Sequence, residues 1–154
     1  MHIIYHDVGG AHSVAVAAAL HLNKLPVDNI PTKEDIISLA TFDKIKKKDI
    51  GHLIYQGKDE FANPVYTLGY KYSSKIALPL LQDTYALLGN KDDLLLIDTK
   101  PTINFLMKVG GFTSRGLGIS SLGRPIVTRG VLKAYPKLVE LVSNVKRNLK
   151  AKKS

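Results

Sequence analysis

The first 22 residues constrain the fold most, because an apolar strand, a glycine-containing turn and an alanine-rich helix follow one another directly. Residues 2–6 carry the β-branched and aromatic side chains that are typical of strands. Residues 14–22 are rich in alanine and predict a helix. Ser13, or His12 just before it, stands where the helix N-cap is expected. A strand that leads through a short turn into a helix is the unit from which α/β folds are built.

The rest of the chain continues this alternation. Strands are predicted at residues 52–56, 64–68, 94–97 and 125–128, and helices at residues 33–40, 74–88, 101–109 and from Pro136 onward. A polar, turn-rich loop joins the first two of these strands and indicates a β-hairpin. Residues 94–97 are continuously apolar, which is typical of a strand covered on both faces. The pattern predicts an α/β fold, a three-layer sandwich with a mostly parallel central sheet and one β-hairpin.

Two of the predicted helices carry apolar side chains at helical spacing. The helix at residues 74–88 places Ile76, Leu80 and Leu87 on one face. The C-terminal helix is expected to turn Leu138, Val142, Val145 and Leu149 inward. Pro79 is expected to bend the first of these helices or to delay its start.

Composition excludes several classes of protein. The 154 residues include no cysteine, which rules out a disulfide scaffold, a thiolate zinc site and a cysteine nucleophile. The apolar runs are too short to span a bilayer, and the N-terminus lacks the basic segment of a signal peptide. We therefore expect a single soluble α/β domain over residues 1–145, cytoplasmic and without a membrane partner, followed by a basic tail at residues 146–154.

Positive charge is concentrated in two places. The last nine residues hold Lys146, Arg147, Lys150, Lys152 and Lys153, and without these five cations the formal charge falls from +9 to +4. A second cluster, Lys44, Lys46, Lys47 and Lys48, lies in a linker. Basic patches bind nucleic acid, but cations are also favourable at an ordinary helix C-terminus. No aromatic residue is interleaved with the tail lysines, so a solvated helix end is the favoured interpretation.

Candidate site residues gather at one predicted edge of the sheet. Ligands of open α/β sheets bind outside the carboxyl ends of the strands, and residues 7–13, 98–100 and 129–130 follow such ends. A glycine-containing turn before a helix offers free N–H groups to an anion. The predicted binding residues are Gly9, Gly10, Ser13, Lys100 and Arg129, and the candidate catalytic residues are His6, His12 and Asp98. The connection at residues 110–124 is expected at the opposite edge, away from this site.

Known phosphate-site templates fit this loop only in part. A Walker A pattern laid on residues 6–13 finds Ser13 but places His12 where the lysine belongs, which argues against an ordinary ATPase. The layout also resembles the phosphate loop of low-molecular-weight tyrosine phosphatases, with His6 in the position of the nucleophilic cysteine. A histidine nucleophile with Asp98 as acid is then conceivable. His6, Asp7 and His12 match no standard metal-site spacing, so no metal or other cofactor is assigned.

The strand residues 3–6 and the Gly9-Gly10-Ala11-His12-Ser13 element resemble a bacterial family of single-domain proteins, domain of unknown function 3189. The similarity extends through residues 57–59, 63–66 and 122–127, which is nearly the whole chain. The resemblance implies a bacterial origin and a single domain, but no activity.

Three functional hypotheses follow. The first is a protein that binds a phosphate-bearing small molecule or nucleotide at the loop, with phosphoryl transfer or hydrolysis as the reaction if it is an enzyme. The second is a non-catalytic module that binds nucleic acid or protein through the basic tail and residues 44–48. The third is an adaptor in which the loop is only structural.

Overall fold

The computed structural model describes residues 1–152, except for the side chain at position 115. In this part the chain forms one sheet with the strand order β2-β3-β1-β4. Its strands are β1 (His2–Asp7), β2 (Ile54–Lys58), β3 (Pro64–Gly69) and β4 (Leu94–Asp98). β1 pairs in parallel with β3 and β4, so that Ile4 lies opposite Tyr66 on one side and Leu96 on the other. β2 pairs antiparallel with β3, and this pair is the expected hairpin.

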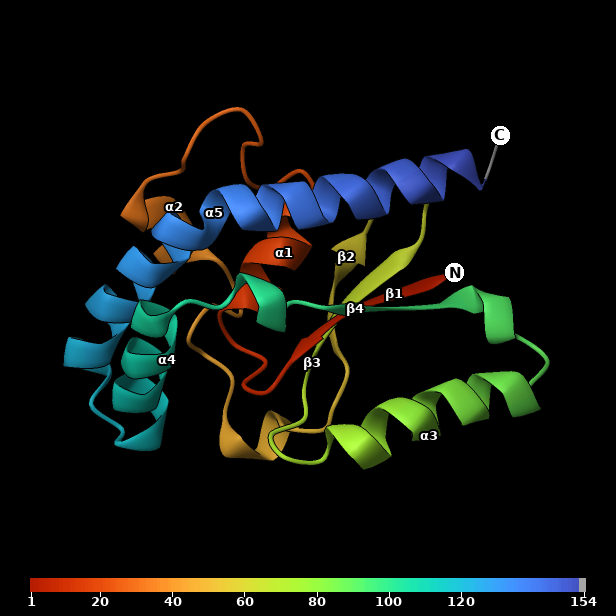
Figure 1. Ribbon diagram of the computed structural model, residues 1–154, viewed down its shortest axis with the longest axis horizontal. Helices are drawn as coiled ribbons and strands as arrows, with labels where there is room; N and C mark the ends of the chain where they lie inside the picture. Colours follow the sequence, from red (N-terminus) through yellow and green to blue (C-terminus); the bar gives the residue numbers. More distant parts are fainter. Residues whose placement is uncertain (153–154) are drawn as a thin grey trace.

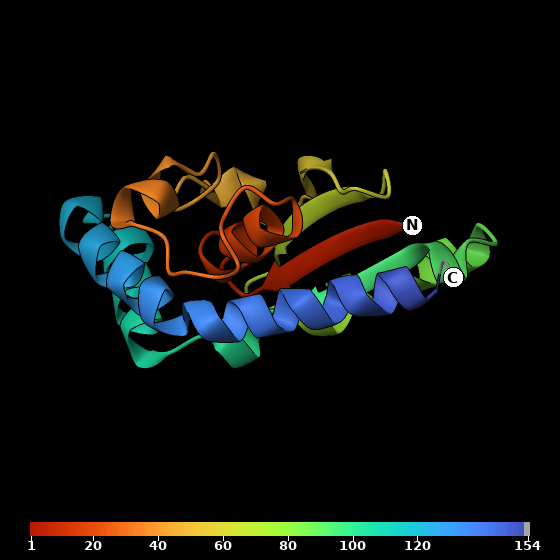
Figure 2. The ribbon, with the colours of Figure 1, turned by 90° about the horizontal axis from the view of Figure 1, so that it is seen from above.

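Helices lie around the sheet, which confirms the predicted α/β fold with a mostly parallel sheet. They are α1 (Ser13–His21), α2 (Lys33–Ser38), α3 (Ser74–Leu87), α4 (Phe105–Gly111) and α5 (Ser120–Ala151). Short turns of 3-10 helix, η1 (Lys47–Asp49), η2 (Lys91–Asp93) and η3 (Lys100–Thr102), and a π-helical turn, η4 (Phe112–Gly116), complete the description. In Figure 1, α1 and α5 lie above the strands and α3 lies below them. Figure 2 shows α5 running along much of the length of the molecule.

α1 lies at the centre of the core. All nine of its residues are buried, and most of them are alanine or valine. Small side chains allow this helix to pack closely against β1, β3 and α5 together. The inward side of α5 agrees with the prediction, because Leu138, Val142 and Leu149 are buried and Val145 packs against the core.

The strand predicted at residues 125–128 is wrong, because these residues belong to α5. α5 begins at Ser120 rather than at Pro136, and it contains Pro125 and Pro136 within its length. The close packing of α4 on α5 explains the difference. A side chain at Gly110 would overlap the backbone of Val127, and one at Gly130 would come within 2.7 Å of the Met107 nitrogen. Tertiary packing along these glycines therefore outweighs the strand preference of the β-branched residues.

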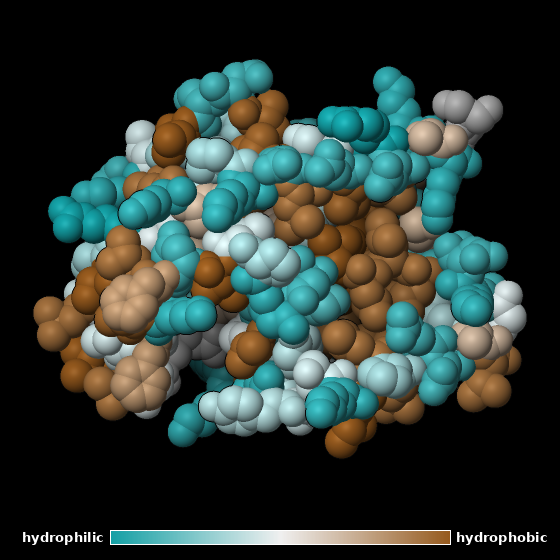
Figure 3. Space-filling model, viewed as in Figure 1, coloured by the Kyte–Doolittle hydropathy of each residue, from teal (hydrophilic) through white to brown (hydrophobic). Residues whose placement is uncertain are grey.

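The strand at residues 94–97 and the helix that precedes it are less buried than the sequence predicts. β4 is an edge strand in which only Ile97 is buried, so it is not covered on both faces. None of the residues of α3 is buried, and Ile76, Leu80 and Leu87 are largely exposed. Pro79 lies inside α3 and does not delay its start. Figure 3 shows the resulting hydrophobic surface between α5 and α3.

Across residues 1–152, no helix combines the length and the apolar character needed to span a membrane.

Candidate functional site

The loop between β1 and α1 is held in shape by the side chain of Asp7. One carboxylate oxygen of Asp7 accepts a hydrogen bond from the Gly10 nitrogen, and the other accepts one from the Ser13 hydroxyl, both at 2.5 Å. Gly10 has a φ of +68°, and a Cβ there would lie 2.7 Å from the Gly69 Cα. Both the positive φ and the close approach to β3 require glycine at position 10.

The same loop is connected to the end of β4. The Ser13 hydroxyl lies 2.9 Å from Thr99 Oγ1, and the Thr99 nitrogen donates to the His6 carbonyl at 3.0 Å. The carboxyl ends of β1 and β4 therefore meet, as the sequence predicts for parallel neighbours.

A cavity of about 730 Å³ opens beside this loop. Four lysines line it, and they come from four separate segments: Lys47 from η1, Lys71 after β3, Lys100 from η3 and Lys108 from α4. Apolar residues, among them Ile50, Ile103 and Met107, form another part of the wall. Asp7 is the only acidic residue among the described residues that line the cavity, so the lining carries a clear positive excess.

The N-terminus of α1 adds to this positive character. His12 is the N-cap residue and Ser13 is the first helical residue, and the His12 side chain makes no capping hydrogen bond. The first N–H groups of a helix have no partner within the helix, and the helix dipole makes this end positive. Gly9, His12 and Ser13 all line the cavity. The site can therefore attract an anion through both side chains and backbone.

His12 also belongs to a polar network that sequence reasoning missed. Its Nε2 lies 3.0 Å from Asp43 Oδ1. Ser114 Oγ donates to the same carboxylate at 2.8 and 3.0 Å, and Arg124 Nε donates to it at 3.1 Å. Burial alone would raise the pKa of Asp43, but the hydrogen bonds from His12, Ser114 and Arg124 outweigh burial and lower this pKa to about 2. Asp43 is therefore ionised throughout the neutral range.

The structure brings together most of the predicted binding residues and one of the candidate catalytic residues, His12. Gly9, His12, Ser13 and Lys100 line the cavity, and Gly10 lies in the loop itself. His6 and Asp98 occupy paired positions in β1 and β4 but are not lining residues.

His6 and Asp98 have other partners. The His6 ring lies 5.7 Å from the Tyr70 ring, and burial lowers the pKa of His6 against the opposing effect of Asp98. The Asp98 carboxylate forms an ion pair with Lys100 Nζ at 3.2 Å, and it also accepts a hydrogen bond from the backbone nitrogen of Lys100 at 2.9 Å. Asp98 thus holds both the backbone and the side chain of Lys100, which does line the cavity.

Arg129 is not brought to the site. It is exposed on α5, because the predicted strand that would have placed it at the sheet edge is helical. The expectation that residues 110–124 lie away from the site is also wrong. Gly111 and Gly116 line the cavity, and Ser114 and Arg124 contact Asp43. Gly123 and Gly130 are seven residues apart, a spacing that places both on one face of a helix. This spacing is the sequence signal that could have indicated a helix instead of a strand at residues 125–128.

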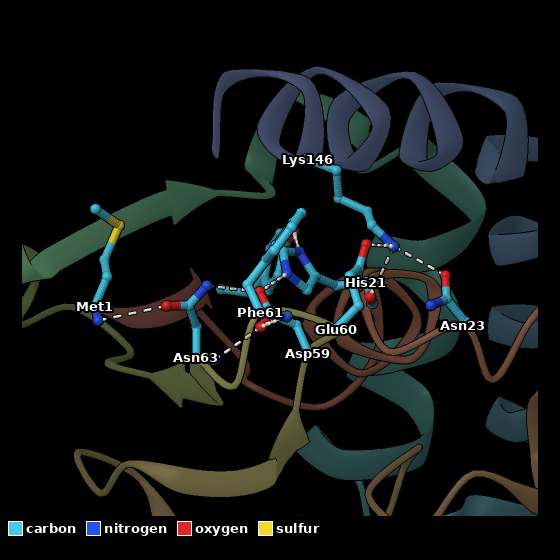
Figure 4. A network of polar contacts seen from close by, with 9 residues as sticks. Met1, His21, Asn23, Asp59, Glu60, Phe61, Asn63 and Lys146 are labelled. Carbon is cyan, nitrogen blue, oxygen red and sulfur yellow. Dashed lines mark hydrogen bonds and ion pairs between the residues drawn. The ribbon is translucent and has the colours of Figure 1, made fainter. Parts of the chain in front are cut away.

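A second buried network lies at the other end of α1, around His21 (Figure 4). Tyr5 OH lies 2.8 Å from His21 Nδ1, and His21 Nε2 lies 3.2 Å from Asp59 Oδ2. Asp59 also accepts hydrogen bonds from the backbone of Phe61 and from the backbone and side chain of Asn63. This network fixes the β2–β3 loop against α1.

In each of the two basic clusters, residues 44–48 and the C-terminal residues from 146 onward, a lysine has a defined place in the structure. Lys146 forms an ion pair with Glu60 at 2.9 Å and donates to Asn23 and to the His21 carbonyl, and α5 continues past it to Ala151. Lys47, from the linker cluster, lines the cavity. Within the described part of the chain, no three His, Asp or Glu side chains are grouped so that they could hold a metal ion.

Comparison with known proteins gives a family but no activity. Neither a curated protein nor a solved structure matches the chain. The family model described as "Protein of unknown function (DUF3189)" matches residues 2–147, and the matched region contains the β1–α1 loop and every side chain that lines the cavity. The chain therefore belongs to the DUF3189 family.

Proposed function

We propose that the protein binds a phosphate-bearing small molecule, such as a nucleotide, in the cavity beside the β1–α1 loop. The observation that carries this proposal is the convergence of Lys47, Lys71, Lys100 and Lys108 on a single cavity. Lysine side chains repel one another when they share a cavity, so an arrangement of four is favourable when an anion lies among them. The N-terminus of α1 supports the same charge preference.

The cavity also suits the rest of such a ligand. Its volume of about 730 Å³ lies within the range of roughly 300–1,000 Å³ that small-molecule sites occupy. Ile50, Ile103 and Met107 offer an apolar wall to a base or another organic group. Gly9 would allow the backbone to approach the phosphate, and Lys100 would donate to it. Four lysines provide charge for more than one phosphate group.

Ligand-dependent stability tests this proposal. The wild-type protein would be heated with inorganic phosphate, pyrophosphate, tripolyphosphate or ATP, and the midpoint of unfolding would be recorded. A ligand present at 100 times its dissociation constant adds about 2.7 kcal/mol to the free energy of unfolding. In a domain of this size, that corresponds to a rise of roughly 5–10 °C.

One lysine variant and one arginine variant test whether the anion binds in the cavity. Lys71→Gln removes one cavity cation and is expected to reduce the shift strongly. Arg129→Gln is the matched control, because it removes one exposed cation that does not line the cavity. Absence of a shift with all four anions, or equal shifts in the two variants, would contradict the proposed site.

A further inference from the structure

We propose that His12 is the general base of a hydrolytic site, acting on a phosphoric anhydride held by the cavity lysines. This inference rests on the proposed function and goes beyond binding, because it assigns a reaction and a residue that performs it. It is carried by the geometry of His12 and by the hydrogen bonds that hold His12 and Asp43 in position.

The hydrogen bond to Asp43 determines which nitrogen of His12 is available. Asp43 is ionised and accepts from His12 Nε2 at 3.0 Å, so Nε2 carries a hydrogen. In the neutral ring Nδ1 then has a free lone pair. An imidazole with one nitrogen bound to a carboxylate and the other free is the arrangement that general bases use.

Space is left open next to that nitrogen. Gly111, the last residue of α4, lies beside the Nδ1 edge of the ring, and it also lines the cavity. A Cβ at position 111 would come within 3.3 Å of His12 Cε1 and 3.5 Å of Nδ1. Glycine at this position therefore keeps the Nδ1 edge of the ring clear of a neighbouring side chain.

Asp43 is held in place through both its backbone and its side chain. Asp43 has a positive φ of 55°, and its nitrogen donates to the Ala11 carbonyl at 3.1 Å. Ser114 and Arg124, from η4 and α5, hold both of its carboxylate oxygens. Asp43 is thus a positioning residue, and its partners fix the His12 ring in one orientation. The other charged groups that line the cavity with His12 are Asp7 and the four lysines.

The proposed reaction is the hydrolysis of a phosphoric anhydride bond by water. A water molecule attacks the terminal phosphorus and forms a new P–O bond, while His12 Nδ1 takes its proton. The bridging P–O bond breaks, and its electron pair leaves with the shortened phosphate chain. The proton on Nδ1 then passes to solvent, so the net result is anhydride plus water giving two phosphate species. The lysines stabilise the charge that develops on the oxygens.

The experiment combines binding and turnover on the same samples. Inorganic tripolyphosphate and ATP serve as probes, calorimetry gives the dissociation constant, and released orthophosphate gives kcat and KM. His12→Gln keeps a donor for Asp43 but cannot accept the proton, so we expect binding within about threefold and a fall in kcat of about 100-fold or more. Asp43→Asn is expected to lower kcat with little change in KM. Free imidazole should restore part of the activity of His12→Ala.

A second variant protects the test against a folding defect. Gly111→Ala alters no titratable group, and it fills the space beside Nδ1. We expect it to lower kcat while tripolyphosphate binding is retained.

The outcomes separate the two proposals. Binding of the probes by the wild-type protein without release of orthophosphate overturns the general-base inference and leaves the proposed function intact. Equal kcat in wild type and His12→Gln also overturns the inference. Absence of binding overturns both.

Discussion

At the scale of single residues, the most unusual feature is a fully buried chain of titratable groups. Tyr5, His21 and Asp59 are joined by hydrogen bonds, and each is at least nine-tenths buried. The pKa of His21 is lowered, because the effect of burial exceeds that of the hydrogen bond to Asp59. Burial also raises the pKa of Tyr5. The consistent arrangement has the Tyr5 hydroxyl donating to His21 Nδ1 and His21 Nε2 donating to Asp59.

This arrangement predicts the effect of removing one hydroxyl. Tyr5→Phe leaves His21 Nδ1 buried without a donor, and we expect a loss of about 1–3 kcal/mol in the free energy of unfolding. Urea unfolding followed by circular dichroism measures the loss. The control is Tyr72→Phe, since Tyr72 is 95% exposed and should change stability by less than about 0.5 kcal/mol. Equal stability of the two variants would contradict the network.

The lowered pKa of His21 also predicts a pH dependence with a definite sign. In the unfolded chain His21 takes up a proton near its ordinary pKa of about 6.5, whereas in the folded protein burial shifts that uptake to lower pH. The unfolded state then binds more protons, so stability is lost as the pH falls below that value. We expect His21 to account for a measurable part of the loss between pH 7.5 and 5.5. Comparing urea unfolding of wild type and His21→Gln at both pH values tests this, and an identical pH dependence would contradict it.

At the scale of secondary-structure elements, the contact between α4 and α5 decides the shape of the site. Gly110, Gly123 and Gly130 allow the two helices and η4 to approach so closely that added side chains would overlap neighbouring backbone. This approach brings Gly111 and Met107 to the cavity and places Ser114 and Arg124 on Asp43. The helix packing and the site are therefore built by the same residues.

Substitution of one of these glycines tests this account. In an exposed helix, Gly→Ala is stabilising by about 1 kcal/mol because alanine has the higher helix propensity. At Gly130 a Cβ would lie 2.7 Å from the Met107 nitrogen, so we expect Gly130→Ala to destabilise the protein by about 1–3 kcal/mol. Thermal unfolding measures the effect. Asn144→Ala, on an exposed position of α5, is the control and should be neutral or slightly stabilising.

At the scale of the whole molecule, the excess of positive charge acts on any ligand of the cavity. The formal net charge is +9, and four of the lysines line the cavity. Salt screens such interactions, with a Debye length of about 10 Å at 0.1 M ionic strength. The long-range field of the molecule and the local lysines should therefore both weaken as salt is added.

Salt dependence separates these two contributions. We expect the dissociation constant for tripolyphosphate to rise by about tenfold or more between 50 and 300 mM KCl. Lys71→Gln should flatten this dependence, because one of the cations in contact with the ligand is lost. Lys137→Gln lowers the net charge equally, but it lies exposed on α5 outside the cavity and should leave the slope nearly unchanged. Equal slopes in the two variants would indicate that net charge alone governs binding.

Local patterns in the sequence determined the α/β class, the β1–α1 unit and the hairpin. They also placed His12, Ser13 and Lys100 at one edge of the sheet, because residues that follow parallel strands must meet there. The helix near residues 33–40 and the buried face of α5 were equally readable, since helical patterns depend on near neighbours only.

The tertiary structure alone decided where residues 110–130 go and what surrounds His12. Residues 125–128 have the local preference of a strand, yet contact with α4 across buried glycines makes them helical, and this moves Arg124 rather than Arg129 to the site. Asp43 lies 31 residues from His12 and 81 from Arg124, in a linker without a recognisable pattern. A contact between residues so far apart depends on how the chain closes in space, and no local sequence preference encodes it.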